Sequence, residues 1–550
     1  MEQIKPARTI RLSERAIVWA VVALALVVRV GLAQADRVIK WDESDYLMLG
    51  RNLWSGQGFT TAGYPEVHYT PLVPLVLGAF QQLAADPEVA SELAYVLCGA
   101  LLILPYHALA RRLYGRRVAL WAAALLAILP ALSASVLYWG TMSEPLYLLL
   151  VYVGLWAAWR ATGDRDTGSG AGWAALAGLM FALAYLARPE AILYFGLFGL
   201  GLLGWRAARG ALRQGRAWAG LLAYAGAFAL LALPYIVYLH QHTGQWTFSG
   251  KVGVTFDLGA AVIEQDPAAY DIATASLDAS GQHLIWFSEQ RFRGPGMLGA
   301  VLADPLGLLR RAWANLRLWF GSFFGWTVLP IWALAFLPLA WCAAPWTRQR
   351  AGRELFLWAA LLPPFGFLIL HIETRFFAPA LPILLLWLAK GLDLAGQWLQ
   401  GSLANWRGRP RPLWDGFWRL LPVGLAVLYF ALMIPLAVRQ GQRGTDFSSR
   451  QVGQWLAANT PADSRVMSRD VAVAVYARRA WVPSPHAEYG PYLAYARYHR
   501  VDYLVITHRE GTVLRPALAF LLDGDNPPPE LELAHVAAGQ QGQTLVYRIK

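Results

Sequence analysis

Three carboxylates fall within four positions of the stretch WDESDYLMLGRNL, residues 41–53: Asp42, Glu43 and Asp45. The stretch begins six residues after an apolar segment of the chain. Carboxylates at a membrane boundary tend to face a cavity and act on something there. A well-placed carboxylate can take a proton from an attacking hydroxyl, so Asp42 and Glu43 are candidate general bases. The alternative is a surface loop in which water solvates them.

Adjacent residues on a helix point about 100° apart, so Asp42 and Glu43 cannot face one hydroxyl equally well. We expect Asp42 to be the base and Asp45 to lie at the exposed end of the cluster.

Two arginines stand alone in otherwise uncharged turns between apolar segments, Arg188 in LARPEAIL and Arg375 in HIETRFFAP. A guanidinium can grip a phosphate with two parallel hydrogen bonds. Each arginine also has a glutamate two residues away, Glu190 or Glu373, so a local ion pair is the competing interpretation.

Two further residues could contact a substrate at the same boundary. Glu144, in YWGTMSEPLYLLL, is followed by Pro145, which suits the first turn of a helix. Glu144 is either a substrate contact or a residue that favours the positive end of that helix. His68, near Glu66 in YPEVHYTPL, could bind phosphate or a metal, although a lone histidine usually binds neither.

The elements that must position these residues are membrane-spanning helices. The 550 residues are 57% hydrophobic and only 15% charged, and mean hydropathy is +0.38. Apolar runs of about 20 residues, many with Trp or Tyr at their ends, are typical of transmembrane helices. We predict eleven spans: 16–35, 89–107, 118–137, 145–160, 171–187, 190–205, 217–239, 322–344, 354–371, 376–391 and 417–438.

The first span could instead be a cleaved signal peptide, since a basic stretch precedes it and small residues follow it. Arg29 inside its apolar core and the many later spans favour an uncleaved helix.

Basic residues predict the orientation of the spans. One set of alternating loops and tails carries 22 Lys and Arg residues, whereas the short connections on the other side carry only Arg188 and Arg375. The positive-inside rule then places the N-terminus in the cytoplasm and the C-terminus outside. The basic residues lie at 5, 8, 11, 15, 111, 112, 116, 117, 160, 165, 206, 209, 213, 216, 348, 350, 353, 390, 407, 409, 411 and 419.

Three long segments fall on the outer side: 36–88, 240–321 and the tail 439–550. The pattern over WDESDYLMLGRNLWSGQG, residues 41–58, indicates a short helix at the membrane surface that ends at a glycine, and 69–84 indicates a second interfacial or re-entrant piece. In the tail, SRVMS, AWVPS and VDYLVITH favour strands, and 447–458 and 490–499 favour helices. We therefore divide the chain into a transmembrane domain, 1–438, and an outer α/β domain, 439–550.

Several function classes are disfavoured. The net charge of +12 is placed in loops between spans, which indicates topology rather than nucleic-acid binding. Cys98 and Cys342 lie inside apolar runs and form no disulfide framework or cysteine metal site. The sequence contains no P-loop, dinucleotide-binding glycine fingerprint or cytoplasmic D-x-D motif for a nucleotide sugar. No internal or inverted repeat points to a secondary transporter.

Five segments in order resemble the GT-C glycosyltransferases, most closely the protein-mannosyltransferase and aminoarabinose-transferase branch, glycosyltransferase family 39 and its relatives. They are WDESDYLMLGRNL, HYTPLVPLVLGAF, TMSEPLYLLL, LARPEAIL and ETRFFAPALPILLLWLA, within 15–395. One departure is Tyr-Thr-Pro at 69–71, where that branch often has a basic residue and Pro-Pro. It leaves open whether His68 or Tyr69 makes the substrate contact.

The resemblance implies an inverting glycosyltransferase of the cell envelope, a hexosyl- or pentosyltransferase. Its donor would be a sugar on a polyprenyl phosphate, and its acceptor a hydroxyl of a protein, lipid or glycan at the outer face of the bilayer. Asp42 would be the base with Glu43 in support, and no cofactor is indicated, although a divalent metal is left open. The resemblance assigns substrate contacts to Tyr46, His68, Glu144, Arg188 and Arg375.

Two other functions remain open at this stage. A flippase or transporter of lipid-linked glycans would also use outer arginines and many spans, but has less use for an outer acidic pair or a large outer domain. A non-enzymatic scaffold could bind a partner through its tail.

Overall fold

A computed structural model describes residues 13–163, 170–251, 255–256, 258–292, 296–325, 328–342, 345–407, 412–443, 445–540 and 542–550. Among the basic residues used to predict orientation, Lys5, Arg8, Arg11, Arg165, Arg409 and Arg411 lie outside these ranges.

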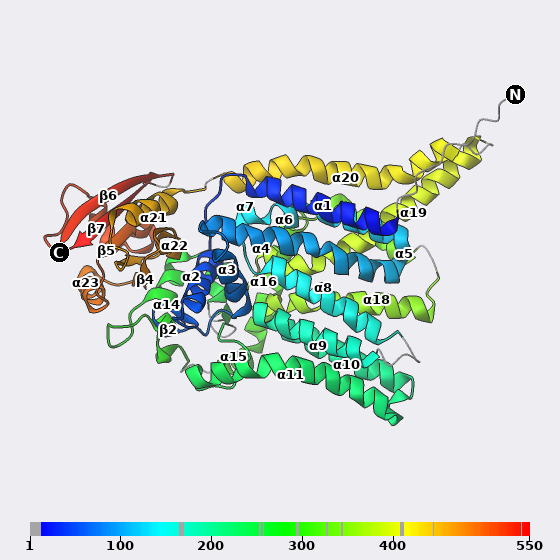
Figure 1. The fold of residues 1–550 in the computed structure, drawn as a ribbon, viewed down its shortest axis with the longest axis horizontal. Coiled ribbons are helices and arrows are strands. Elements are labelled where there is room, and N and C mark those ends of the chain that lie inside the picture. Colours follow the sequence, from blue (N-terminus) through cyan, green and yellow to red (C-terminus); the bar gives the residue numbers. More distant parts are fainter. Residues whose placement is uncertain are drawn as a thin grey trace.

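A bundle of long helices forms the larger part of the molecule (Figure 1). Apolar side chains cover most of each helix, as expected for helices that face lipid or other helices. Its main members are α1 (Glu14–Ala33), α4 (Pro87–Leu101), α5 (Ile103–Ile128), α8 (Glu144–Ala161), α9 (Gly170–Ala187), α10 (Ala191–Ala208), α11 (Gly215–Thr243), α18 (Arg348–Leu361), α19 (Leu381–Arg407) and α20 (Pro412–Gln442).

Eight helical segments in the described part of the chain are long and apolar enough to cross a membrane. One of them, Pro87–Ile128, contains one predicted span and most of another, because Gly115 with φ 84° interrupts α5. Figure 1 shows the chain reversing there, so that α4 and the short helices α6 (Pro130–Ser133) and α7 (Ser135–Trp139) lie toward the other end of the bundle. The protein is thus a multi-pass membrane protein, as predicted.

Two predicted spans differ from the observed helices, and a third matches a helix that is not among the eight apolar segments. Span 118–137 is broken after Ile128, because the residue before Pro130 avoids helical geometry. Span 145–160 is α8, which is 18 residues long but is not among the eight apolar segments. The predicted span 322–344 is not one helix: its described part holds the end of α16 (Pro305–Phe323), a 3₁₀ helix, Ile331–Ala335, and α17, Leu337–Cys342, with prolines at 330 and 338.

At one end of the bundle, two short helices lie side by side: α2 (Asp42–Trp54) and α3 (Leu72–Gln81), joined through the hairpin of β1 (Thr60–Thr61) and β2 (Tyr64–Pro65). The first helix was predicted, and α3 falls within 69–84, which was predicted as an interfacial or re-entrant piece. Gly50 and Gly78 let their backbones touch, since a Cβ on Gly50 would lie 2.6 Å from the carbonyl oxygen of Pro74.

The segment between α11 and the next bundle helices folds over the same end. It contains α13 (Gly259–Ile263), α14 (Pro267–Ala275), the 3₁₀ helices Ile285–Phe287 and Glu289–Phe292, α15 (Gly296–Ala303) and α16 (Pro305–Phe323). Two further 3₁₀ helices, Pro363–Ile369 and Thr374–Ala380, connect α18 to α19, and Ala211–Arg213 precedes α11.

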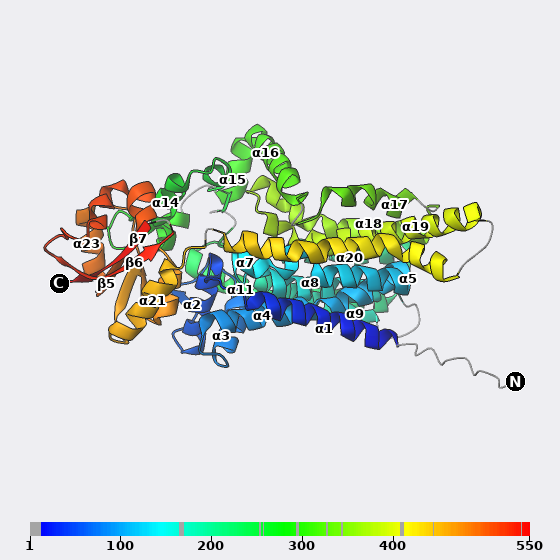
Figure 2. The same ribbon diagram turned by 90° about the horizontal axis from the view of Figure 1, so that it is seen from above.

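The tail forms a small α/β domain beyond that end of the bundle (Figures 1 and 2). Its five-stranded sheet has the order β4-β3-β5-β7-β6, with β3 parallel to β4 and β5 and with β7 antiparallel to β5 and β6. The elements are α21 (Ser448–Asn459), β3 (Arg465–Ser468), α22 (Val471–Ala477), β4 (Ala480–Pro483), α23 (Tyr489–Tyr498), β5 (Tyr503–Thr507), a π-helix (Glu510–Leu514), a 3₁₀ helix (Pro516–Leu522), β6 (Leu531–Gly539) and β7 (Gly542–Ile549).

Candidate functional site

Asp42 lies in the first turn of α2, where the helix dipole favours a carboxylate. Nη2 of Arg375 lies 3.4 Å from Oδ2 of Asp42, and Nζ of Lys251 lies 3.9 Å from the same oxygen. The hydroxyl of Tyr69 donates to Oδ1 over 3.4 Å. The predicted base therefore sits among two cations and a phenol that come from three distant segments of the chain.

Arg375 joins Asp42 to two other carboxylates. It forms an ion pair with Glu373, and its Nη1 lies 3.9 Å from Oε1 of Glu144. Arg188 pairs with the same Glu144 oxygen and with Glu190. Glu144 thus lies between the two arginines at the start of α8.

Both local ion pairs that competed with a phosphate-binding role are present, Arg188 with Glu190 and Arg375 with Glu373. They do not account for the whole geometry. Arg375 also reaches Asp42, which is 333 residues away in the sequence. The two arginines, Glu144 and Asp42 therefore form one charged cluster.

The cations control the protonation of Asp42. Burial raises the pKa of its carboxyl, but the charges of Lys251 and Arg375 outweigh burial and hold the pKa below its ordinary value. Asp42 is therefore ionised at neutral pH, as a general base must be.

Asp45 has the opposite character. Burial and the nearby charges of Asp42 and Glu66 raise its pKa well above the ordinary value. The hydroxyl oxygen of Tyr69 lies 3.3 Å from Oδ2 of Asp45 and 3.4 Å from Oδ1 of Asp42. A phenol has only one proton to donate, so it cannot donate to both carboxylates at once. The expectation that Asp45 is the exposed end of the cluster is wrong, because α3 and the turn before it bring Tyr69 against it.

Glu43 points away from Asp42 and is fully buried, with 0% of its surface exposed. Arg37 donates to both of its carboxylate oxygens, over 2.9 and 3.0 Å, and the Ser91 hydroxyl donates over 2.5 Å. The backbone N–H of Lys40 donates over 3.2 Å. Any support that Glu43 gives to catalysis must therefore act through the backbone that leads into α2.

His68 and Tyr46 surround the cluster. The backbone N–H groups of His68 and Tyr69 both donate to Glu66, which fixes the turn before α3. The ring of His68 faces Arg291, with Nδ1 3.2 Å from Nη2, and burial lowers its pKa well below the ordinary value. The ring of Tyr46 packs edge-on against Tyr69 at a centroid distance of 5.2 Å. Of the two residues left open, Tyr69 is the one in contact with Asp42.

Sequence reasoning missed Lys251 and Arg291. Lys251 lies 5.1 Å above the ring of Tyr69, and Arg291 donates to the neighbouring carbonyl of Gly250 over 2.9 Å. The sequence offered one signal for Lys251, which is that lysine is rare in this chain: only five of the 47 basic residues are Lys. Neither residue lies in a periodic pattern that would place it near Asp42.

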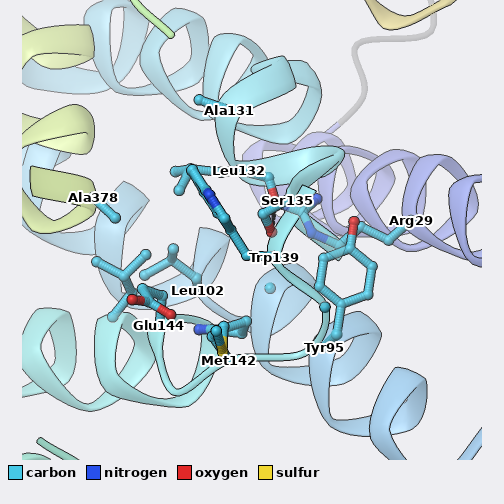
Figure 3. A pocket seen from close by; sticks show the side chains of 14 residues that line it. Arg29, Tyr95, Leu102, Ala131, Leu132, Ser135, Trp139, Met142, Glu144 and Ala378 are labelled. Atoms are coloured by element: carbon cyan, nitrogen blue, oxygen red, sulfur yellow. Dashed lines mark hydrogen bonds between the residues drawn. The ribbon is translucent and has the colours of Figure 1, made fainter. Parts of the chain in front are cut away.

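A cavity of about 20 Å³ lies inside the bundle next to the cluster. Figure 3 shows the Glu144 carboxylate on one side of the cavity, and Arg29 and Tyr95 on the other. This volume is room for about one water molecule. The cavity is too small for a sugar or an isoprene unit.

No group of three or more His, Cys, Asp or Glu side chains in the described ranges is arranged to hold a metal ion. The carboxylates of the cluster are instead neutralised by Arg188, Lys251 and Arg375.

Comparisons with known proteins agree with this architecture. Residues 68–238 match the family described as dolichyl-phosphate-mannose-protein mannosyltransferase. The fold is similar to that of ArnT from Cupriavidus metallidurans bound to undecaprenyl phosphate, with a TM-score of 0.57, 15% identity, and 96% of this chain and 97% of that chain covered. No curated protein sequence matches the chain.

The fold is also similar to that of the Archaeoglobus fulgidus oligosaccharyltransferase in the apo form, with a TM-score of 0.59 and 17% identity. That alignment covers 91% of this chain and 71% of the other. The resemblance expected from the sequence is therefore confirmed at the level of the fold: the chain is a multi-pass membrane protein with the fold of ArnT and of the archaeal oligosaccharyltransferase, and its residues 68–238 match the protein-mannosyltransferase family model.

Proposed function

We propose that the protein transfers a sugar from a polyprenyl-phosphate donor to an acceptor hydroxyl. The observation that carries the proposal is the contact of Asp42 with Arg375 and Lys251 at the end of the bundle that the tail covers. One cluster thus holds a base for the hydroxyl and cations for a phosphate. The similarity in fold to ArnT, which was solved with undecaprenyl phosphate, supports a lipid-linked donor.

In the reaction, the acceptor hydroxyl attacks the anomeric carbon of the donor sugar. Asp42 takes the hydroxyl proton as the new carbon–oxygen bond forms. The bond between the anomeric carbon and the phosphate oxygen breaks, and the electron pair leaves with the lipid phosphate. Attack opposite the leaving group inverts the anomeric centre.

The leaving phosphate gains a negative charge in the transition state. Arg375 and Lys251 can stabilise that charge, and Arg188 lies near them through Glu144. When the phosphate pairs with these cations, they stabilise the ionised carboxylate of Asp42 less strongly. The pKa of Asp42 then rises, and Asp42 becomes a better base. Donor binding and base strength are therefore coupled in this proposal.

In this proposal, the site lies at the outer face of a bacterial inner membrane. The middle of α5, the start of α18 and the end of α19 carry described basic residues, and these parts lie at the opposite end of the bundle from α2 and the tail (Figure 1). That arrangement fits a cytoplasmic N-terminus, a membrane domain over 1–438 and an outer domain over 439–550. A hexose or pentose and an acceptor on a protein, lipid or glycan complete the proposal.

Purified protein in lipid nanodiscs tests this function. The probes are mannose, glucose and 4-amino-4-deoxyarabinose linked to undecaprenyl phosphate, offered with a membrane extract that supplies acceptors. The proposal expects release of free undecaprenyl phosphate and label in an acceptor. A flippase would move the donor across liposomes without releasing undecaprenyl phosphate, and that result would contradict the proposal.

A further inference from the structure

The residue before Asp42 has an unusual backbone conformation. Trp41 has φ 52° and ψ −138°, a region that side chains other than glycine rarely adopt. Its side chain is 69% exposed, so burial of the indole does not hold the conformation in place. Such strain persists only where the surroundings enforce it, and it is found at functional sites.

Residues 37–40 form the approach to Trp41 and α2, and contacts of their side chains and backbone hold this segment in place. Arg37 is bonded to Glu43, and Nζ of Lys40 donates to the carbonyl of Leu137 over 3.0 Å and to the Thr445 hydroxyl over 3.3 Å. The backbone N–H of Ile39 donates to the phenol oxygen of Tyr476 over 2.8 Å. This last contact comes from α22 of the C-terminal domain.

Tyr476 is held in turn from the bundle side. Its hydroxyl donates its single proton to Glu88 at the start of α4, which leaves the oxygen free to accept from Ile39. Arg450 of α21 donates to the carbonyl of Arg37 over 3.1 Å. The C-terminal domain therefore fixes the main chain at Arg37 and Ile39, just ahead of Trp41 and Asp42.

We propose that Tyr476 is a positioning residue, through which the C-terminal domain holds the strained approach to α2 and so orients Asp42; this inference rests on the proposed function. Without the hydroxyl, the buried N–H of Ile39 has no acceptor. The chain could then relax at Trp41, and the first turn of α2 with Asp42 would move.

Loss of the hydroxyl does not remove the other contacts between the domain and the bundle. Arg478 donates to the carbonyl of Ala85, and Arg51 donates to the carbonyl of Arg479 over 3.1 Å. Tyr476→Phe therefore changes the path into α2 while the domain stays docked.

The test compares Tyr476→Phe with Tyr547→Phe. Tyr547 is a matched control, because its buried hydroxyl donates to the carbonyl of Leu521 within the C-terminal domain, over 2.8 Å. With the most rapidly used undecaprenyl-phosphate sugar, we expect Tyr476→Phe to lower kcat about tenfold or more, since a misplacement of 1 Å can cost about 10²-fold. KM for the donor should stay within about twofold of wild type, and Tyr547→Phe should leave kcat unchanged.

A second variant separates positioning from general loss of stability. Glycine adopts a positive φ without strain, so Trp41→Gly should reduce the dependence of α2 on Tyr476. The fall in kcat that Tyr476→Phe causes should therefore be smaller in the Trp41→Gly background than in the wild-type background.

The outcomes are distinct. A wild-type protein that turns over no polyprenyl-phosphate sugar refutes the proposed function and this inference with it. With an active wild type, equal kcat values for Tyr476→Phe and Tyr547→Phe overturn only the positioning role. A fall in kcat that Trp41→Gly does not reduce also overturns it, because the strained approach would then be irrelevant.

Discussion

At the scale of single residues, Asp42 and Glu43 show how neighbouring side chains of one chemical type acquire different roles. Four donors form hydrogen bonds to the two carboxylate oxygens of Glu43, so this carboxylate has a structural role. Asp42 instead lies 3.4 to 3.9 Å from two cations and a phenol. These longer contacts can be exchanged for substrate groups. The helix turn of about 100° between the two residues accounts for the difference.

Arg375→Ala should lower kcat/KM for the donor about 10²–10³-fold, by analogy with the loss of a donor to a developing anion. Arg375→Lys should recover only part of the rate, because an ammonium lacks the planar fork. The Ala variant also leaves Asp42, Glu144 and Glu373 without their shared cation, so thermal unfolding should be measured alongside. Wild-type turnover by a folded Arg375→Ala protein would show that the arginine serves only its ion pairs.

Lys251→Met should move the acid limb of the pH profile of kcat/KM to higher pH. Lys251 helps to hold the pKa of Asp42 below its ordinary value, so its removal raises that pKa. The base must be ionised, so activity is then lost at a higher pH as the pH falls. Lys251→Arg keeps the charge and should keep the limb near its wild-type position. An unchanged limb in Lys251→Met would mean that Asp42 is not the titrating base.

At the scale of elements, the position of Asp42 depends on the contact of α2 with α3. Gly50→Ala should destabilise the protein by about 1–3 kcal/mol, because the new methyl meets the backbone of Pro74 and Gly78 and the helices must separate. Gly201→Ala in α10 is the control, since a Cβ there meets no atom within 4 Å. Thermal unfolding in detergent measures both variants. Equal melting temperatures for Gly50→Ala and wild type would contradict the close packing of α2 on α3.

Elements with strong local patterns were predictable from the sequence, and those set by distant contacts were not. The helix at 42–54 and the strands at 465–468, 480–483 and 503–507 follow from local periodicity. The hairpin of β6 and β7 was not predicted, because a register shift between Leu533 and His535 interrupts β6, and buried and exposed residues do not alternate along this strand. The prediction of one span over 322–344 was wrong, because prolines interrupt the apolar run.

At the scale of the whole molecule, the charged cluster could be predicted only in part. Alternating spans place Asp42, Glu144, Arg188 and Arg375 on one side of the membrane, and the structure brings these four together. Lys251 and Tyr476 come from a long loop and from the C-terminal domain, whose packing no local pattern reveals. Sequence reasoning therefore identified the residues at helix ends and missed those that tertiary contacts supply.

The orientation of the molecule has a direct test. An alkaline phosphatase fused after Lys550 should be active, because that enzyme folds only in an oxidising compartment, where its disulfides form. A green fluorescent protein fused at the N-terminus should fluoresce in the cytoplasm. The opposite pattern would move Asp42 and all its partners to the cytoplasmic face.

The most direct measurement of the central claim is the rate of sugar transfer by Asp42→Asn, together with its affinity for the donor. Asparagine keeps the size of the side chain but cannot take the proton, so the rate should fall about 10²–10⁴-fold. Donor affinity should match or exceed that of wild type, because the neutral amide no longer competes with the phosphate for Arg375 and Lys251. Glu43→Gln should act through stability, since Arg37 loses its buried partner. A folded Asp42→Asn protein that transfers sugar at the wild-type rate would contradict the account.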